Sequence, residues 1–201
     1  MTHDRVVATK KATRRRVLAL RDALTSEERN SKSTAINERL LALPAFADAE
    51  TVAAYASFAT EFDTGPFLKQ VLARNKRLVL PRVDRDSKRI QFHFVCNLDG
   101  ALVPGPWGIR EPDPTQCGVA DTGEIDFMLV PGVAFTPGCA RLGYGGGFYD
   151  AAIEETRTDC AKIAAAFAVQ IVKDLPLEAH DQKVDLVITE DGEYARPVTG
   201  D

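Results

Sequence analysis

Long apolar segments and an excess of positive charge are both missing from this chain. No apolar run approaches the roughly 18 residues that a transmembrane helix requires. The 25 basic and 29 acidic side chains give a formal net charge of −4, whereas a general nucleic-acid-binding protein is usually strongly basic. The N-terminal sequence MTHDRVVATKKATRRR has no apolar segment typical of a secretory signal. We therefore expect a cytoplasmic protein, with neither nucleic acid nor membrane as a partner.

Cysteine and histidine are also scarce. The four cysteines, none of them in a CxxC pair, are Cys96, Cys117, Cys139 and Cys160. Their wide spacing gives little support to a zinc site or a disulfide framework. The three histidines are isolated, with no suitably spaced Ser, Cys or metal-ligating partner, so the sequence supports no nucleophilic triad.

The residues that are present are typical of a folded domain. The chain has 201 residues, of which 45% are hydrophobic and 27% charged, an ordinary balance for a globular protein. Domains usually span about 100–200 residues. We therefore expect one domain over residues 1–201, with a core that needs no disulfide or metal to stabilise it. We also expect the protein to be a monomer.

Two helices are expected in the first forty residues. Apolar residues recur at helical spacing within 5–24. Thr25 and Glu28 then form a capping box, which predicts that a second helix begins there and ends before Pro44.

The rest of the chain alternates between buried strands and helices. A strand at 51–57, a helix at 64–74 and a strand at 77–83 predict a parallel βαβ unit. Further strands are expected at 90–95, 126–130, 162–167 and 184–188, with a helix at 148–158 and a long irregular connection at 97–125. This order predicts an α/β fold, a single-domain layered sandwich with a mostly parallel, Rossmann-like sheet. Long irregular connections are often functional.

The most informative segment is RLGYGGGFYD at 141–150, which lies between a strand and a helix. Its glycines let backbone N–H groups approach an anion, and the following helix adds the positive end of its dipole. No Gly-Lys-Ser/Thr follows, so it is not a Walker A loop, and Phe148 occupies the position of the last glycine of a dinucleotide fingerprint. From the glycines alone, a flexible surface turn is an equally good interpretation.

The complete string resembles the signature of 5-formyltetrahydrofolate cyclo-ligases, also called 5,10-methenyltetrahydrofolate synthetases. Other segments agree in order and spacing: KKATR at 10–14, EFDT at 61–64, LPRV at 80–83, VPGVAF at 130–135 and KVD at 183–185. The resemblance implies a single α/β domain, related in fold to sugar-phosphate isomerases and CoA transferases. It also implies an enzyme that uses ATP and Mg²⁺ to close 5-formyltetrahydrofolate into 5,10-methenyltetrahydrofolate, with release of ADP and phosphate.

The resemblance also implies site residues. ATP would contact Lys10, Lys11, Arg14, Arg141, Leu142, Gly143, Tyr144, Gly145, Gly146, Gly147, Phe148 and Tyr149. Lys10 and Arg14 are four residues apart on one helix face, which Val17 continues, so these two cations would flank the packed side. Lys11 better fits a solvated face.

Folate and metal contacts are implied in the same way. The folate substrate would contact Ala56, Glu61, Trp107, Tyr144, Gly145, Gly146, Gly147 and Phe148. Glu61 follows the first strand, at the edge where α/β sheets bind ligands, and a carboxylate there can accept hydrogen bonds from a pterin. Asp150 and Asp185 would be the acids associated with Mg²⁺, which commonly takes one or two carboxylates besides water and phosphate.

Two departures from the family pattern keep alternatives open. Phe148 replaces a common Tyr, and Ala151 replaces an Arg that often follows the Asp. A non-catalytic nucleotide- or folate-binding protein remains an alternative, as does an enzyme of related fold such as a sugar-phosphate isomerase or an acyl transferase.

Overall fold

A seven-stranded, mostly parallel sheet forms the centre of the chain. The computed structural model describes residues 2–84, 87 and 89–197. The strands are ordered β11-β10-β9-β6-β1-β2-β3. They span Thr51–Ala53 (β1), Arg77–Asp84 (β2), Arg89–Phe94 (β3), Phe127–Val130 (β6), Ala161–Ala165 (β9), Leu186–Ile188 (β10) and Glu193–Ala195 (β11). Only β3 and β11, at the two edges, pair antiparallel within this sheet. The expected α/β fold with a mostly parallel sheet is confirmed.

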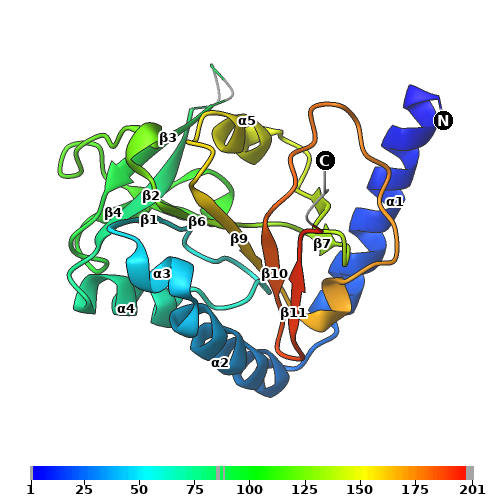
Figure 1. Cartoon of the computed structure of the whole chain (residues 1–201), viewed down its shortest axis with the longest axis horizontal. Coiled ribbons are helices and arrows are strands. Elements are labelled where there is room, and N and C mark those ends of the chain that lie inside the picture. The colour runs from blue at the N-terminus through cyan, green and yellow to red at the C-terminus, as the bar shows by residue number, and fades with distance from the viewer. Residues whose placement is uncertain (1, 85–86, 88, 198–201) are drawn as a thin grey trace.

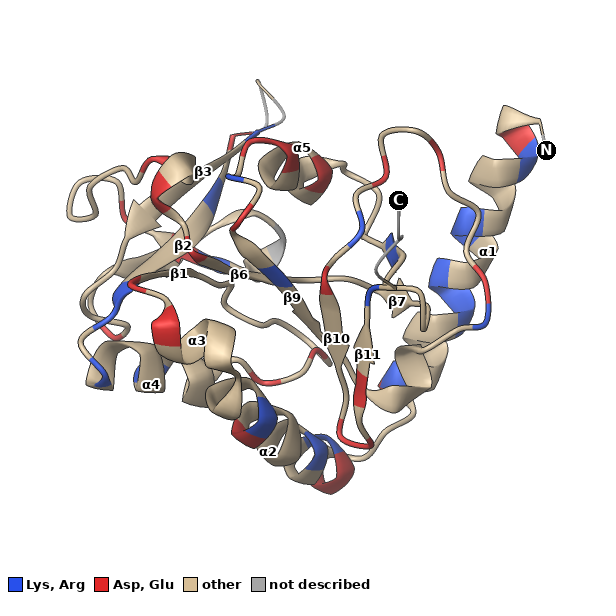
Figure 2. Cartoon of the chain, viewed as in Figure 1, with Lys and Arg blue, Asp and Glu red and all other residues tan. Residues whose placement is uncertain are grey.

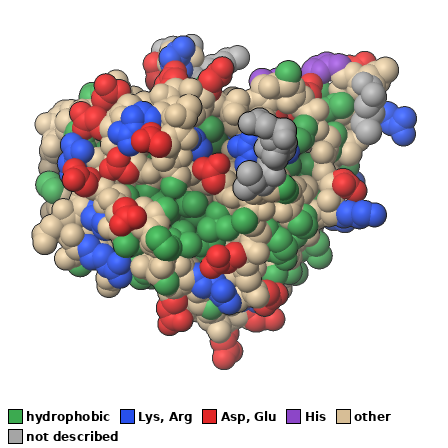
Figure 3. All heavy atoms as spheres, viewed as in Figure 1, with side chains coloured by type: hydrophobic (Ala, Val, Ile, Leu, Met, Phe, Trp, Pro, Cys, Tyr) green, Lys and Arg blue, Asp and Glu red, His purple; other side chains and the backbone are tan. Residues whose placement is uncertain are grey.

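Helices cover both faces of the sheet (Figure 1). They span His3–Asp22 (α1), Ser26–Ala42 (α2), Pro44–Asp48 (α3), Gly65–Ala73 (α4) and Phe148–Glu154 (α5), with single 3₁₀ turns at Pro106–Gly108 (η1), Thr122–Glu124 (η2) and Ala168–Gln170 (η3). On one face α3 and α4 place Phe46 and Phe67 against Phe127 of the sheet. On the other face α5 buries Ala152 and Ile153 in a second apolar cluster. Figure 3 shows apolar side chains gathered between α3 and β10 on the first face.

The N-terminal helix packs beside the sheet, not over it. Its buried residues are Val6, Lys10, Val17 and Arg21, which recur on one stripe. Val17 joins an apolar cluster with Val133 and Leu142, close to the glycine-rich segment. This confirms that Lys10 and Val17 lie on the packed side of one helix. No helix of the described residues is long and apolar enough to cross a membrane.

Local sequence patterns predict the longer elements well. The capping box of α2 is present: Oγ1 of Thr25 accepts from Glu28 N, and Oε2 of Glu28 accepts from Thr25 N. The parallel pairing of β1 with β2, expected from the βαβ pattern, is confirmed.

The shorter elements differ from the predictions. The connection at 97–125 contains a hairpin of β4 (Leu102–Pro104) and β5 (Arg110–Pro112), and the segment before the glycines contains β7 (Ala134–Phe135) paired with β8 (Arg141–Leu142). Such short strands depend on tertiary contacts more than on a pattern of their own. The strand expected at 51–57 ends at Ala53, α5 ends at Glu154, and Pro44 begins α3 instead of only following α2, as Pro favours the first turn of a helix.

Candidate active site

A cavity of about 500 Å³ opens at the carboxyl ends of β1 and β6. Its walls come from the segments after β1 and β6, from β2 and β3, from the β4–β5 hairpin and from the glycine loop, which we define as residues 141–150. Most of the wall is apolar or aromatic, including Tyr55, Phe58, Pro81, Val83, Ile90, Phe148 and Tyr149. Its charged groups are Glu61, Arg110, Glu111, Arg141 and Asp150. A flat aromatic ligand with a few polar edges suits such a lining.

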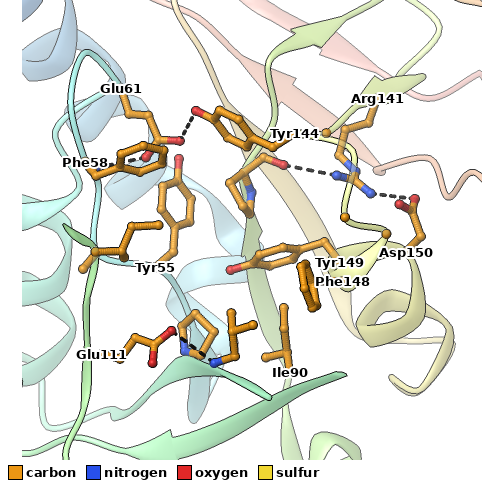
Figure 4. Close-up of a pocket in the computed structure, with 18 of the residues that line it drawn as sticks. Tyr55, Phe58, Glu61, Ile90, Glu111, Arg141, Tyr144, Phe148, Tyr149 and Asp150 are labelled. Atoms are coloured by element: carbon orange, nitrogen blue, oxygen red, sulfur yellow. Dashed lines mark hydrogen bonds and ion pairs between the residues drawn. The ribbon is translucent and has the colours of Figure 1, made fainter. Parts of the chain in front are cut away.

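Glu61 presents its carboxylate to this cavity (Figure 4). Oε2 accepts from the backbone N–H of Phe58 at 3.1 Å, and Oε1 accepts from the hydroxyl of Tyr144 at 2.5 Å. Burial raises the pKa of Glu61, while the hydrogen bonds from Tyr144 and Phe58 and the charge of Arg21 lower it, leaving a net increase. The expected position of Glu61, beyond the end of the first strand, is confirmed by this geometry.

Three tyrosines share the cavity wall with Glu61. Burial raises the pKa of Tyr55, Tyr144 and Tyr149 above the ordinary value for a phenol. All three therefore remain protonated near neutral pH, and the hydroxyl of Tyr144 donates its proton to Glu61. The hydroxyl of Tyr149 is buried and has no hydrogen-bond partner among the residues that the structure describes. Tyr149 therefore brings to the cavity wall a phenol whose proton is not donated within the described residues.

Arg141 and Asp150 form an ion pair at the opposite wall. Nη2 of Arg141 donates to Oδ1 of Asp150 at 2.6 Å, and Nη1 donates to the carbonyl of Pro131 at 3.3 Å. Oδ1 of Asp150 also accepts from the backbone N–H of Gln182 at 3.0 Å. Arg141 is thus a buried cation that orients Asp150 in the cavity wall, and is not a solvent-exposed guanidinium.

The glycine loop is shaped by two positive φ angles. They occur at Gly145 (φ 108°) and at Gly147 (φ 74°), which precedes α5. Gly146 does not have a positive φ, so its backbone conformation does not by itself require a glycine. Its constraint is steric instead, because a Cβ on Gly146 would lie 2.4 Å from Cε2 of Phe148. Phe148 keeps its aromatic ring in the wall, as expected despite the lost hydroxyl.

The cations of α1 lie against this loop and against an acidic segment, residues 178–181, which contains Glu178 and Asp181. Nε of Arg14 donates to the carbonyl of Gly143 at 2.8 Å. Nζ of Lys10 donates to Glu178 at 2.8 Å and to Asp181 at 2.6 Å. Figure 2 shows this acidic segment running beside the basic residues of α1. Burial alone lowers the pKa of Lys10, but the hydrogen bonds to Asp181 and Glu178 outweigh it and raise the pKa.

Lys10 is therefore a buried cation that is paired with two carboxylates. Lys11 is exposed, as expected for a solvated position.

The two acids expected near Mg²⁺ lie in different places. Asp150 lines the cavity, whereas Asp185 lies outside it, immediately before β10. Oδ2 of Asp185 accepts from the backbone N–H of Lys162 in β9, at 2.8 Å. Within the described ranges no group of three or more His, Cys, Asp or Glu side chains is arranged to hold a metal ion. The role of Asp185 stays a prediction from the resemblance.

Asp181 is the acid that the fold places near the expected nucleotide residues. It pairs with Lys10, and the next residue, Gln182, bonds to Asp150. No local sequence signal distinguished Asp181 from its neighbours.

Arg21 and Glu111 were also not predicted from the sequence as residues at or beside the cavity. Arg21 lies seven positions after Arg14 on the same stripe of α1, a spacing that could have identified it. Glu111 is a buried acid of the cavity wall, and Oε1 accepts from the backbone N–H of Val83 at 3.2 Å. Of the other expected contacts, Ala56 lines the cavity, and the side chain of Trp107 lies outside the described part of the structure.

Comparison with known proteins identifies the family. The model of the 5-formyltetrahydrofolate cyclo-ligase family matches residues 6–190. The chain belongs to the 5-formyltetrahydrofolate cyclo-ligase family. The chain is therefore a member of an enzyme family, and the resemblance to this family found in the sequence is confirmed.

Relatives and solved structures agree with this assignment. A 5-formyltetrahydrofolate cyclo-ligase of Escherichia coli is 31% identical over 84% of this chain and 93% of that protein, and one of Mus musculus is 27% identical over 84% and 87%. The NMR structure of a 5,10-methenyltetrahydrofolate synthetase from Aquifex aeolicus superposes with a TM-score of 0.83 at 32% identity, covering 96% of this chain and 95% of that one. A Mycoplasma pneumoniae 5,10-methenyltetrahydrofolate synthetase has a TM-score of 0.74 at 26% identity, covering 90% and 98%.

Proposed function

We propose that this chain catalyses the ATP- and Mg²⁺-dependent cyclisation of 5-formyltetrahydrofolate to 5,10-methenyltetrahydrofolate, releasing ADP and phosphate. The observation that carries the proposal is one cavity that joins an acidic, aromatic pocket to the glycine loop, which α1 holds through Arg14. A pterin suits the first part and a phosphate chain suits the second.

The reaction needs activation of a poor electrophile. The formyl oxygen is a poor leaving group, and transfer of the γ-phosphoryl group of ATP to it would convert it into a phosphate. The neighbouring folate nitrogen then attacks the formyl carbon, the C–O bond to phosphate breaks, and the nitrogen loses its proton. The contribution of the protein is to hold the two substrates in line and to place cations and N–H donors around the phosphates.

We assign these tasks to residues of the cavity wall and to two cations of α1. Glu61 accepts hydrogen bonds from the pterin edge, and the surrounding aromatic rings exclude water. The N–H groups of the glycine loop, with Arg14 and Lys10, face the phosphates. For Lys10 this requires the phosphate to compete with Glu178 and Asp181 for the same ammonium.

Magnesium fits the hard oxygen donors at one end of the cavity. Asp150 presents a carboxylate there, and Asp181 lies one residue from the Gln182 N–H that holds it. A set with so few protein acids suits Mg²⁺, which keeps several waters and binds substrate phosphates. When bound, the ion would neutralise charge on the transferred phosphoryl group.

Product formation is the direct test of the proposed function. We expect 5,10-methenyltetrahydrofolate, which absorbs in the near ultraviolet, to accumulate only when ATP, Mg²⁺ and 5-formyltetrahydrofolate are all present. A non-catalytic binding protein would form no 5,10-methenyltetrahydrofolate. An isomerase or acyl transferase of related fold would show no ATP-dependent formation of this product. Either result would refute the proposal. The monomeric state and the cytoplasmic location stay predictions.

Alanine at Lys10 or Arg14 is expected to raise the KM for ATP more than the KM for folate. Arg14→Ala removes the bond to the Gly143 carbonyl, and Lys10→Ala removes the ammonium from the acidic pair. Arg15→Ala is the matched control, since this exposed cation of the same helix is not among the expected ATP contacts and should leave both constants unchanged. Equal dependence on ATP in all three variants and the wild type would refute a role of α1 in nucleotide binding.

Asparagine substitutions can decide which acid accompanies Asp150. We expect Asp181→Asn to raise the Mg²⁺ concentration needed for half-maximal turnover, and to weaken Mg²⁺-dependent ATP binding measured by calorimetry without folate. Asp185→Asn should affect mainly thermal stability, because its carboxylate bonds to the Lys162 N–H outside the cavity. The reverse pattern would support the prediction from the resemblance.

A further inference from the structure

A chain of hydrogen bonds joins α1 to Glu61 through the glycine loop. Arg21, in the last turn of α1, donates from Nη1 to the hydroxyl oxygen of Tyr144 at 3.0 Å. The same hydroxyl donates to Oε1 of Glu61 at 2.5 Å. The ring of Tyr144 also packs against Phe58, with 5.6 Å between ring centroids. Three segments that are distant in the sequence therefore meet at the carboxylate that faces the folate pocket.

Arg21 is fixed in place on its other side. Its side chain is buried, with 3% of the residue exposed. Nε donates to Oγ1 of Thr60 at 3.0 Å, and Thr60 donates in turn to Oδ1 of Asp22 at 2.5 Å. Thr60 directly precedes Glu61, so the guanidinium bridges the loop that carries Glu61 and the loop that carries Tyr144. Arg21 itself is not part of the cavity wall.

We propose that Arg21 is a positioning residue, which acts through the Tyr144 hydroxyl to hold the Glu61 carboxylate ionised and directed at the folate ring. The proposal rests on the proposed function, which makes Glu61 the acceptor for the pterin. Helix α1 then positions a folate-binding residue through Arg21, in addition to binding the nucleotide through Lys10 and Arg14.

The direction of each hydrogen bond follows from the groups involved. A guanidinium has only donors and keeps its proton in proteins, so the Tyr144 oxygen must accept from Arg21. That leaves the single phenol proton for Glu61, and burial keeps it there by raising the pKa of Tyr144.

The neighbours of Glu61 act on its charge in opposite directions. Tyr55 and Tyr149 share its buried cavity and stay neutral, and burial raises the pKa of Glu61. The hydrogen bonds from Tyr144 and the Phe58 N–H, together with the charge of Arg21, lower it. Loss of either Tyr144 or Arg21 therefore moves the pKa of Glu61 further upward.

The test is the pH dependence of folate binding by the full chain. Binding of 5-formyltetrahydrofolate is measured by calorimetry without ATP from about pH 4.5 to 8. This pH range begins near the ordinary pKa of a Glu carboxyl and extends well above it. In the wild type, affinity falls as the pH drops through the pKa of Glu61. In Tyr144→Phe we expect this midpoint to move upward by about one pH unit, which is a tenfold weaker affinity on the acid side.

Matched variants separate the relay from general effects. Tyr149→Phe removes a hydroxyl from the same wall that is not bonded to Glu61, and its midpoint should stay at the wild-type value. Arg21→Met should shift the midpoint in the same direction as Tyr144→Phe. Because Arg21 acts partly through Tyr144 and partly through its own charge, the double variant should shift the midpoint by less than the sum of the two single shifts. If Arg21→Met does not fold, Arg21→Lys replaces it, since one ammonium cannot span both Thr60 and Tyr144.

Several results would overturn the inference. A Tyr144→Phe or Arg21→Lys protein that loses thermal stability but keeps the wild-type midpoint would show a structural role only. Additive shifts in the double variant would show that Arg21 acts independently of Tyr144. If the wild type binds no folate at any pH, the proposed function fails, and the carboxyl ¹³C titration of Glu61 by NMR in the ligand-free variants then decides the relay itself.

Discussion

Valine at Gly146 is expected to lower turnover by at least about a hundredfold, the effect of losing one well-placed donor, while the protein stays folded. A Cβ at this position would lie 2.4 Å from Cε2 and 2.5 Å from Cδ2 of Phe148. The ring of Phe148, which lines the cavity, would therefore have to shift. Gly146 is exposed, so the melting temperature should change by only a few degrees, at roughly 2–4 °C per kcal/mol for a chain of this size.

Two further glycine variants make this prediction decisive. Gly118→Val is the control, because a Cβ there meets no atom within 4 Å and this exposed residue is outside the cavity wall. Gly146→Ala introduces the same collision with less bulk and should give a smaller loss. Turnover of Gly146→Val near the wild-type value, in a protein with a normal melting temperature, would contradict the importance of this loop.

Glutamine at Glu61 is expected to weaken the binding of 5-formyltetrahydrofolate by about ten- to a hundredfold and to leave ATP binding almost unchanged. A carboxylate accepts charge-assisted hydrogen bonds from a pterin, each contributing about 1.5–3 kcal/mol, and every 1.4 kcal/mol is about tenfold in affinity. The amide keeps the shape but loses the charge. Calorimetry with each ligand separately measures both affinities.

The pH dependence gives this prediction a second readout. Because burial raises the pKa of Glu61, its carboxylate takes up a proton at a higher pH than an exposed Glu does. Folate affinity of the wild type should therefore fall as the pH drops through this raised value, while the glutamine variant shows no such decrease. For folding the sign is opposite: a raised carboxyl pKa means that stability is lost as the pH rises through it. The free energy of unfolding of Glu61→Gln should thus be no lower than that of the wild type at neutral pH. If Glu61→Gln binds folate as tightly as the wild type does, Glu61 is a structural residue of its loop and not a folate-binding residue.

Local sequence patterns were enough to predict the longer helices, the parallel βαβ unit and the edge of the sheet where the site lies. Helical spacing and the Thr25–Glu28 capping box act within one turn of chain, and the βαβ pattern implies a parallel pair with one handedness. Glu61 and the glycine loop both follow strands of the central region, so their position near the carboxyl edge could be derived before any contact was known. The glycine-loop string was specific enough to indicate the family, which the comparisons confirm.

The pairing of charged groups and the constraint on Gly146 could not be predicted from local patterns, because both depend on contacts between distant segments. Glu61 and Tyr144 are 83 positions apart, and Lys10 and Asp181 are 171 apart. No periodicity connects such positions, since each pairing depends on how α1, the glycine loop and the segment before β10 pack together. The same holds for Gly146, whose constraint is the ring of Phe148 and not its own backbone angle. Local patterns encode the backbone path, whereas burial and charge pairing depend on which distant segments the packed core brings together.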